Sequence, residues 1–173
     1  AVPSPEALSW PHDIMRSVNA SALVNTLGHL AGVLLFGIVL ALLLQDRATR
    51  AVTGNKPILA AALALLWNLA SLLVLGAEQP DSFATRCTVA VGFSVLSLLP
   101  AVLFDLCLSG GWLARAGYLL SATAIVPHVI EVFRPDTDLH RAALAAISIG
   151  FGILTAIAAA GALTTAPRAT GPR

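Results

Sequence analysis

Residues 17–45 read SVNASALVNTLGHLAGVLLFGIVLALLLQ and contain no Asp, Glu, Lys or Arg. A helix needs about 20 mostly apolar residues to cross the hydrocarbon core of a bilayer, so this stretch is long enough to span it. Four further segments lack formal charges in the same way: 57–77, 87–104, 116–130 and 142–167. The sequence therefore predicts five transmembrane helices, at roughly 22–45, 57–76, 86–108, 112–133 and 139–163.

The composition supports a membrane protein. Hydrophobic residues make up 57% of the 173 residues and charged residues only 11%, whereas soluble domains carry about 25% charged residues. A net charge of +1 gives no reason to expect a polyanionic partner. We therefore predict an all-α polytopic bundle of five transmembrane helices whose first partner is the lipid bilayer, and we expect neither nucleic-acid binding nor a cytosolic enzyme.

The chain divides into three parts by charge and hydropathy. Residues 1–21 form an outer N-terminal segment, which is either a short interfacial helix or a frayed end. Residues 22–163 form the five-helix transmembrane domain, and residues 164–173 are expected to be a flexible cytoplasmic tail.

The basic residues predict an orientation, because cytoplasmic loops carry an excess of Lys and Arg. Six basic residues fall on one side of the predicted bundle, namely Arg47, Arg50, Lys56, Arg115, Arg168 and Arg173. The other four are Arg16, Arg86, Arg134 and Arg141. The bias predicts an N-terminus outside and a C-terminus in the cytoplasm, and we expect the membrane to be a bacterial inner membrane.

Small residues are the expected packing positions, because they let membrane helices approach closely. Gly28 and Gly32 form a G-x-x-x-G on the first helix, and Gly117 and Ser121 repeat the small-residue spacing on the fourth.

Polar side chains inside the spans are costly and therefore informative. Asn25 and His29 are four residues apart and share a face of the first helix. At about 1.5 Å per residue, His29, Asn68 and His128 lie at similar depths in the outer leaflet, and Glu131 lies just above them. Two groups fall outside this layer: Asp105 is expected at the opposite interface near Arg115, and His12 and His140 are expected to be exposed.

Three interpretations of this layer stay open. It is a hydrogen-bond network that fixes helix packing, or a haem b site with His29 and His128 as the two axial ligands. The third is a ligand, proton or quinol site in which His128 and Glu131 titrate as a pair. No metal site beyond such a haem iron is predicted, since no third ligand is evident.

The first helix resembles the opening of multi-pass bacterial sensor histidine kinases. The similarity lies in residues 25–29 (Asn-Thr-Leu-Gly-His), Gly32, residues 36–37 (Phe-Gly) and residues 45–47 (Gln-Asp-Arg), with Trp67-Asn68 and Pro127-His128 further along. It implies a membrane input region that precedes a cytoplasmic kinase module. Residues 1–173 hold no phospho-acceptor or ATP-binding segment, so we expect no catalytic activity in this chain.

The sequence thus favours a membrane sensory or input domain, with a homodimer or a kinase module as partner and the outer polar layer as its ligand or haem site. Two alternatives remain. One is a b-type cytochrome or quinol-linked electron-transfer subunit, and the other is a structural subunit of a membrane complex.

Overall fold

The computed structural model of the chain describes residues 10–46, 54–108, 110–135 and 137–165. These residues form five helices and no strand: α1 (Trp10–Gln45), α3 (Lys56–Leu75), α4 (Phe83–Leu108), α5 (Trp112–Phe133) and α6 (Leu139–Thr165). All five are long and apolar enough to cross a membrane, with Ala20–Gln45 as the spanning part of α1. The predicted all-α membrane bundle is therefore confirmed.

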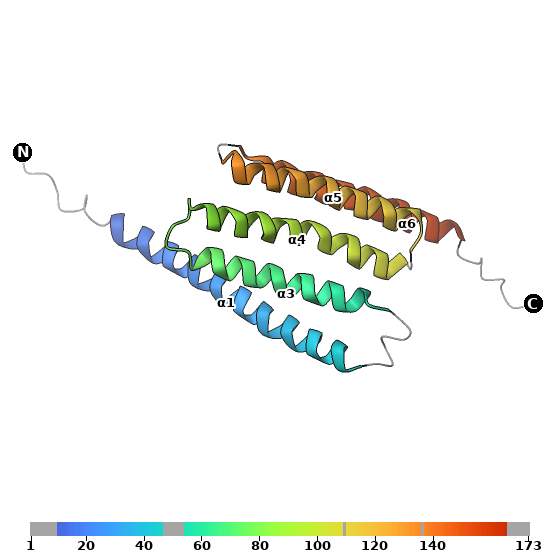
Figure 1. Cartoon of the computed structure of the whole chain (residues 1–173), viewed down its shortest axis with the longest axis horizontal. Coiled ribbons are helices and arrows are strands. Elements are labelled where there is room, and N and C mark those ends of the chain that lie inside the picture. The colour runs from blue at the N-terminus through green and yellow to red at the C-terminus, as the bar shows by residue number, and fades with distance from the viewer. Residues whose placement is uncertain (1–9, 47–53, 109, 136, 166–173) are drawn as a thin grey trace, which may run out of the picture.

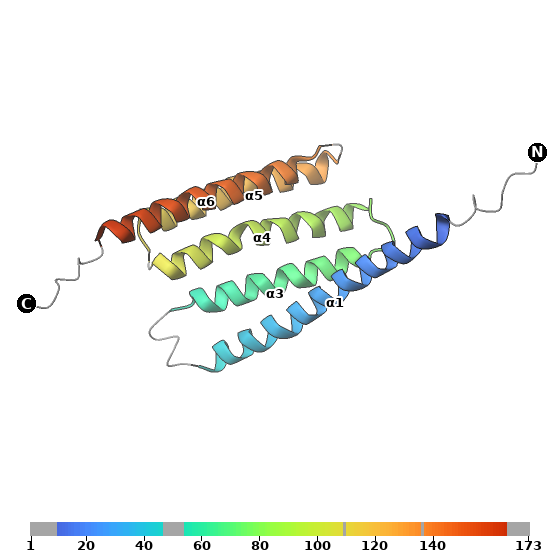
Figure 2. The ribbon, with the colours of Figure 1, turned by 180° about the vertical axis from the view of Figure 1, so that it is seen from behind.

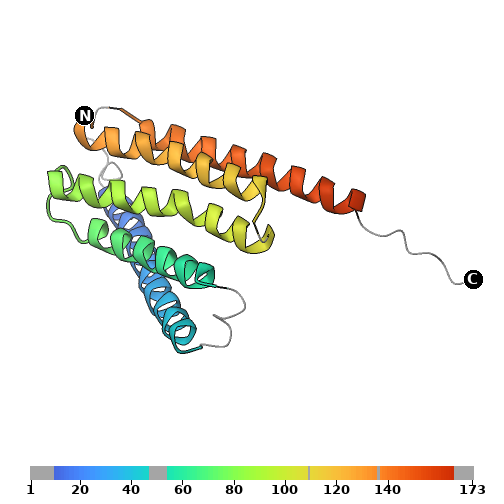
Figure 3. The ribbon, with the colours of Figure 1, turned by 45° about the vertical axis from the view of Figure 1, so that its right-hand side comes forward.

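The helices run alternately up and down, and neighbours in sequence are neighbours in space (Figure 1). α1 packs on α3, α3 on α4, α4 on α5 and α5 on α6, and α6 also touches α4. Figure 2 shows α6 covering α5 on the far side, and Figure 3 shows α1 crossing its neighbours obliquely. We call the end that holds the α3–α4 and α5–α6 connections the N-terminal end of the bundle, and the opposite end the C-terminal end.

Two helices begin earlier than predicted. α1 begins at Trp10 and runs without a break into the span, so residues 10–21 belong to the same continuous helix as the first span. Pro11 suits the first turn of a helix, and no glycine or proline follows until Gly28. α4 begins at Phe83 because the Ser82 hydroxyl accepts a hydrogen bond from the Thr85 backbone N–H at 3.1 Å, as helix-capping residues do. Residues 1–9 and 166–173 lie outside the described residues.

The centre of the bundle is built from small side chains. Ala101 and Val102 of α4 are fully buried, as are Ser97 of α4 and Ser121 and His128 of α5. Many of the leucines instead point outward, where a bilayer would cover them. Membrane helices gain little hydrophobic free energy by packing apolar side chains on one another, because lipid tails are equally apolar. They associate instead by approaching closely through small residues.

The predicted packing glycines behave differently from one another. A Cβ atom at Gly32 would collide with the Asn68 side chain of α3, so α1 can approach α3 there only with a glycine. A Cβ at Gly117 would lie 3.2 Å from the Phe151 ring of α6. Gly28 is exposed, and a Cβ there would meet nothing within 4 Å. The predicted role of Gly28 in packing helices of this chain against each other is therefore not found in the structure.

Candidate functional site

A buried polar seam runs along the interface of α4 and α5. Ser97 Oγ lies 3.1 Å from His128 Nε2, and nearer the C-terminal end the Tyr118 hydroxyl donates to Asp105 Oδ2 at 3.3 Å. The helices are antiparallel, so these pairs occupy successive levels of one interface. Ser121 lies between them in sequence, is fully buried, and its hydroxyl has no partner among the described residues.

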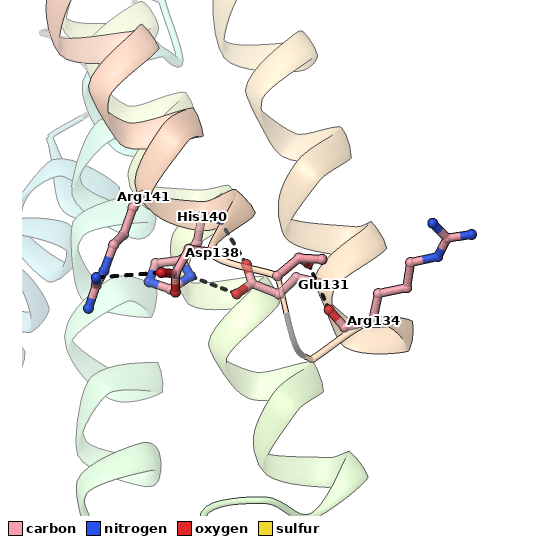
Figure 4. Close-up of polar contacts among 6 residues, drawn as sticks. Glu131, Arg134, Asp138, His140 and Arg141 are labelled. Atoms are coloured by element: carbon pink, nitrogen blue, oxygen red, sulfur yellow. Dashed lines mark hydrogen bonds and ion pairs between the residues drawn. The ribbon is translucent and has the colours of Figure 1, made fainter.

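At the N-terminal end, a carboxylate joins the end of α5 to the start of α6 (Figure 4). Glu131 accepts two hydrogen bonds from His140, one from the backbone N–H at 2.9 Å and one from Nδ1 at 2.8 Å. The sequence predicted an exposed His140, but the residue is half-buried and held by this contact, which we call the Glu131–His140 clasp. The sequence signal that could have found this contact is proximity: Glu131 and His140 are nine positions apart, on either side of a short turn that contains Pro135.

The clasp forms one wall of a cavity of about 240 Å³, which we call the clasp cavity. Its polar lining residues are Asp81, Arg86, His128, Glu131 and His140. The remaining walls are largely apolar and include the Phe93 ring, which stacks with His128 at a centroid distance of 5.5 Å and with His140 at 5.3 Å. Three helices and the α3–α4 connection therefore meet at this cavity.

Two residues that line the clasp cavity each have a buried polar atom with no hydrogen-bond partner among the described residues. These atoms are Arg86 Nε and His128 Nδ1. His128 is only 1% exposed. Buried polar groups in proteins are usually hydrogen-bonded. A molecule bound in the cavity could therefore supply the missing hydrogen-bond partners of these two residues.

His29 belongs to a second cavity, of about 210 Å³, between α1, α3 and α4. Its Nδ1 donates to Asn68 Oδ1 at 3.1 Å, and Asn68 Nδ2 donates to the Ala64 carbonyl at 2.7 Å. The two bonds together define the amide orientation of Asn68 and the donor nitrogen of His29. Asn25 also lines this cavity.

Aromatic rings connect the two cavities. The His29 ring contacts Trp67 at a centroid distance of 6.1 Å, and Trp67 contacts Phe93 at 5.7 Å. Phe93 lines both cavities and stacks with His128. Of the predicted polar layer, the structure thus brings together Asn25, His29 and Asn68 in one group and His128 and Glu131 in another.

A haem held by both histidines does not fit this arrangement. The Nε2 atom of His128 is directed at Ser97 of α4, while His29 lies against α3 and lines a different cavity. The two imidazoles are therefore not presented to one iron atom. Within the described ranges, no group of three or more His, Cys, Asp or Glu side chains is placed to hold a metal ion.

A buried carboxylate, that of Asp105, lies toward the C-terminal end of the bundle. Lys56 Nζ of α3 is 2.9 Å from Asp105 Oδ2, which also accepts from Tyr118. The sequence placed Asp105 near Arg115, but its cationic partner is Lys56. Ser97, Phe93 and Arg86 were also missed as site residues, because a serine or phenylalanine in a span and an arginine at its end are ordinary in a single sequence.

Comparison with family models, with curated proteins and with solved structures finds no match for this chain.

Proposed function

We propose that this chain is a membrane sensory or input domain, in which the clasp cavity receives the signal and α6 carries it across the bilayer. The observation that carries the proposal is the Glu131–His140 clasp. It joins the last turn of α5 to the first turn of α6 at the wall of a cavity with unpaired buried polar atoms. A change of contents in the cavity would act directly on the start of α6.

The packing of α6 favours this role. α6 lies at the edge of the bundle, where it packs mainly on α5, and its buried residues are Ala143 and Ile147. A helix that packs mainly on one neighbour can shift by about 1–2 Å, the scale of helix movements in known switches. Such a shift would reach the C-terminal end of the bundle, because α6 continues to Thr165.

The predicted orientation gives the movement a direction. With the N-terminus outside, the clasp cavity faces the outer leaflet of a bacterial inner membrane and α6 ends at the cytoplasmic surface. The resemblance of the first helix to sensor histidine kinases supports a cytoplasmic kinase module or a second copy of the chain as the receiver of the signal.

The proposal is tested by measuring whether the clasp sets the position of α6. Spin labels on the native Cys107 and on Cys at Leu163 in a Cys87→Ser chain report the distance between the C-terminal ends of α4 and α6. Both positions are exposed, Leu163 by 80%. We expect Glu131→Gln to shift or broaden the distance distribution in nanodiscs. Asp138→Asn is the matched control, since this carboxylate lies at the same end and is 76% exposed. Identical distributions for Glu131→Gln and wild type would contradict the proposal.

A further inference from the structure

We propose that the clasp cavity binds an oxyanion carried on an apolar body, with Arg86 and His128 as the receiving residues. This inference rests on the proposed input function, whose own test uses no ligand, so the two can fail separately. The oxyanion can come from a small organic acid or from a lipid headgroup, and the experiment below distinguishes these sources.

Arg86 is the first part of the argument. Its Nε atom is buried and unpaired, and Arg86 makes no ion pair with any residue in the described part of the chain. A guanidinium offers five N–H donors in a fixed fork that matches carboxylate and phosphate geometry. A partly buried guanidinium that makes no ion pair at a cavity wall therefore suits an oxyanion.

The position of Arg86 in α4 adds to the positive electrostatic potential that a ligand would meet. Arg86 lies in the first turn of a helix that begins at Phe83 and extends over 26 residues. The N-terminal turn of a helix carries partial positive charge, which favours anions. The helix end and the side chain thus favour the same sign of ligand.

His128 supplies the second donor. When the Ser97 hydroxyl donates to Nε2, the proton of the neutral imidazole is on Nδ1, a buried atom without a partner on a residue that lines the cavity. A ligand oxygen is the natural acceptor for this N–H. Because His128 is deeply buried, its orphan nitrogen cannot be satisfied by bulk water.

Two carboxylates, Glu131 and Asp81, also line the cavity and would repel an anion, but hydrogen bonds from His140 and exposure to solvent reduce their effect. Both oxygens of Glu131 are already engaged by His140, and Asp81 is exposed. The apolar walls formed by Phe93, Val89 and Val132 suit the body of the ligand. Together these features select an amphipathic acid over a small inorganic anion.

The test uses the full chain in phosphatidylcholine nanodiscs and titrates phenylacetate by calorimetry, with 2-phenylethanol as the uncharged control. We expect saturable binding of the acid and none of the alcohol. Arg86→Gln should weaken binding by about tenfold or more, because a hydrogen bond to a charged group is lost. Arg86→Lys keeps the charge but lacks the Nε–H and should fall between the two. Arg141→Gln, an exposed arginine at the same end, should bind like wild type.

The same titration in nanodiscs containing phosphatidylglycerol identifies the source of the oxyanion. An unchanged affinity assigns the site to a free acid. Weaker phenylacetate binding by wild type in phosphatidylglycerol discs, with the residual affinity of Arg86→Gln the same in both kinds of disc, assigns it to a lipid headgroup. The proposal is overturned if wild type binds neither the acid nor anionic lipid at this site. It is also overturned if Arg86→Gln, shown to be folded by its circular dichroism, binds as tightly as wild type.

Discussion

Ser97 Oγ and His128 Nε2 lie 3.1 Å apart at the buried interface of α4 and α5, and the His128 side chain also lines the clasp cavity. One imidazole thus connects helix packing to the candidate site. A ligand that bound Nδ1 would act on a ring whose other nitrogen, Nε2, is hydrogen-bonded to Ser97 of α4. The hydrogen-bond network and the ligand site that the sequence left as alternatives therefore share a residue.

Removing the serine should loosen this contact. Ser97→Ala leaves His128 without its partner on α4, and we expect the unfolding free energy in mixed micelles to fall by about 1 kcal/mol, the scale of interhelical hydrogen bonds in membrane proteins. Ser148→Ala removes an exposed serine that bonds only to its own helix, and it should change little. Equal effects of the two substitutions would show that the Ser97–His128 contact contributes no stability.

Alanine substitutions at two glycines of α1 should have clearly different effects on stability. Gly32→Ala places a Cβ against the Asn68 side chain, and overpacking of this kind costs about 1–3 kcal/mol. Gly28→Ala places its Cβ in open space and should leave the stability of the monomer unchanged or slightly raised. Thermal unfolding in detergent measures both. Equal melting temperatures for the two variants would refute the close approach of α1 and α3 at Gly32.

The Lys56–Asp105 ion pair should be worth less than a fully buried one. The Lys56 side chain is 40% exposed, so solvent screens the charge, whereas that of Asp105 is 11% exposed. We expect Lys56→Met to cost about 1 kcal/mol, because Asp105 then keeps only Tyr118 as a partner.

The double variant Lys56→Met, Asp105→Leu should recover much of that loss, since no unpaired charge remains. Chemical unfolding of the single and double variants gives the comparison. A double variant less stable than Lys56→Met alone would contradict the argument from an unpaired charge.

The orientation follows from the six-to-four distribution of basic residues. A membrane-impermeant maleimide added outside intact cells should label Cys at Asp81 and fail at Asn55 in a chain without native cysteines. Both positions are exposed at opposite ends of the bundle. Labelling at Asn55 and protection at Asp81 would reverse the orientation and place the clasp cavity at the cytoplasmic surface.

The sequence was sufficient to predict the helices and insufficient to predict their contacts. Charge-free stretches locate all five spans, because the cost of burying charge in lipid is a local property. The depth of a residue is likewise local, which is why His29, Asn68 and His128 could be placed in one layer. Which way a side chain faces depends on helix rotation and neighbours. His29 therefore lies against Asn68 and His128 against Ser97, a pairing that spacing alone does not contain.

The partner of Asp105 shows the same limit. Arg115 is near it in sequence, but α3 lies beside α4, which brings in Lys56 from far along the chain. His140 was expected to be exposed because it lies at the start of a helix near the membrane surface, and its burial depends on the turn that directs it back to Glu131.

The central claim is that the contents of the clasp cavity move α6. The most direct measurement is the distance between spin labels at Cys107 and at Cys in place of Leu163, in phosphatidylcholine nanodiscs, with and without phenylacetate at a concentration that calorimetry shows to be saturating. The account predicts a displacement of about 1–2 Å in wild type and none in Arg86→Gln. Identical distance distributions in the bound and unbound wild-type chain would contradict it.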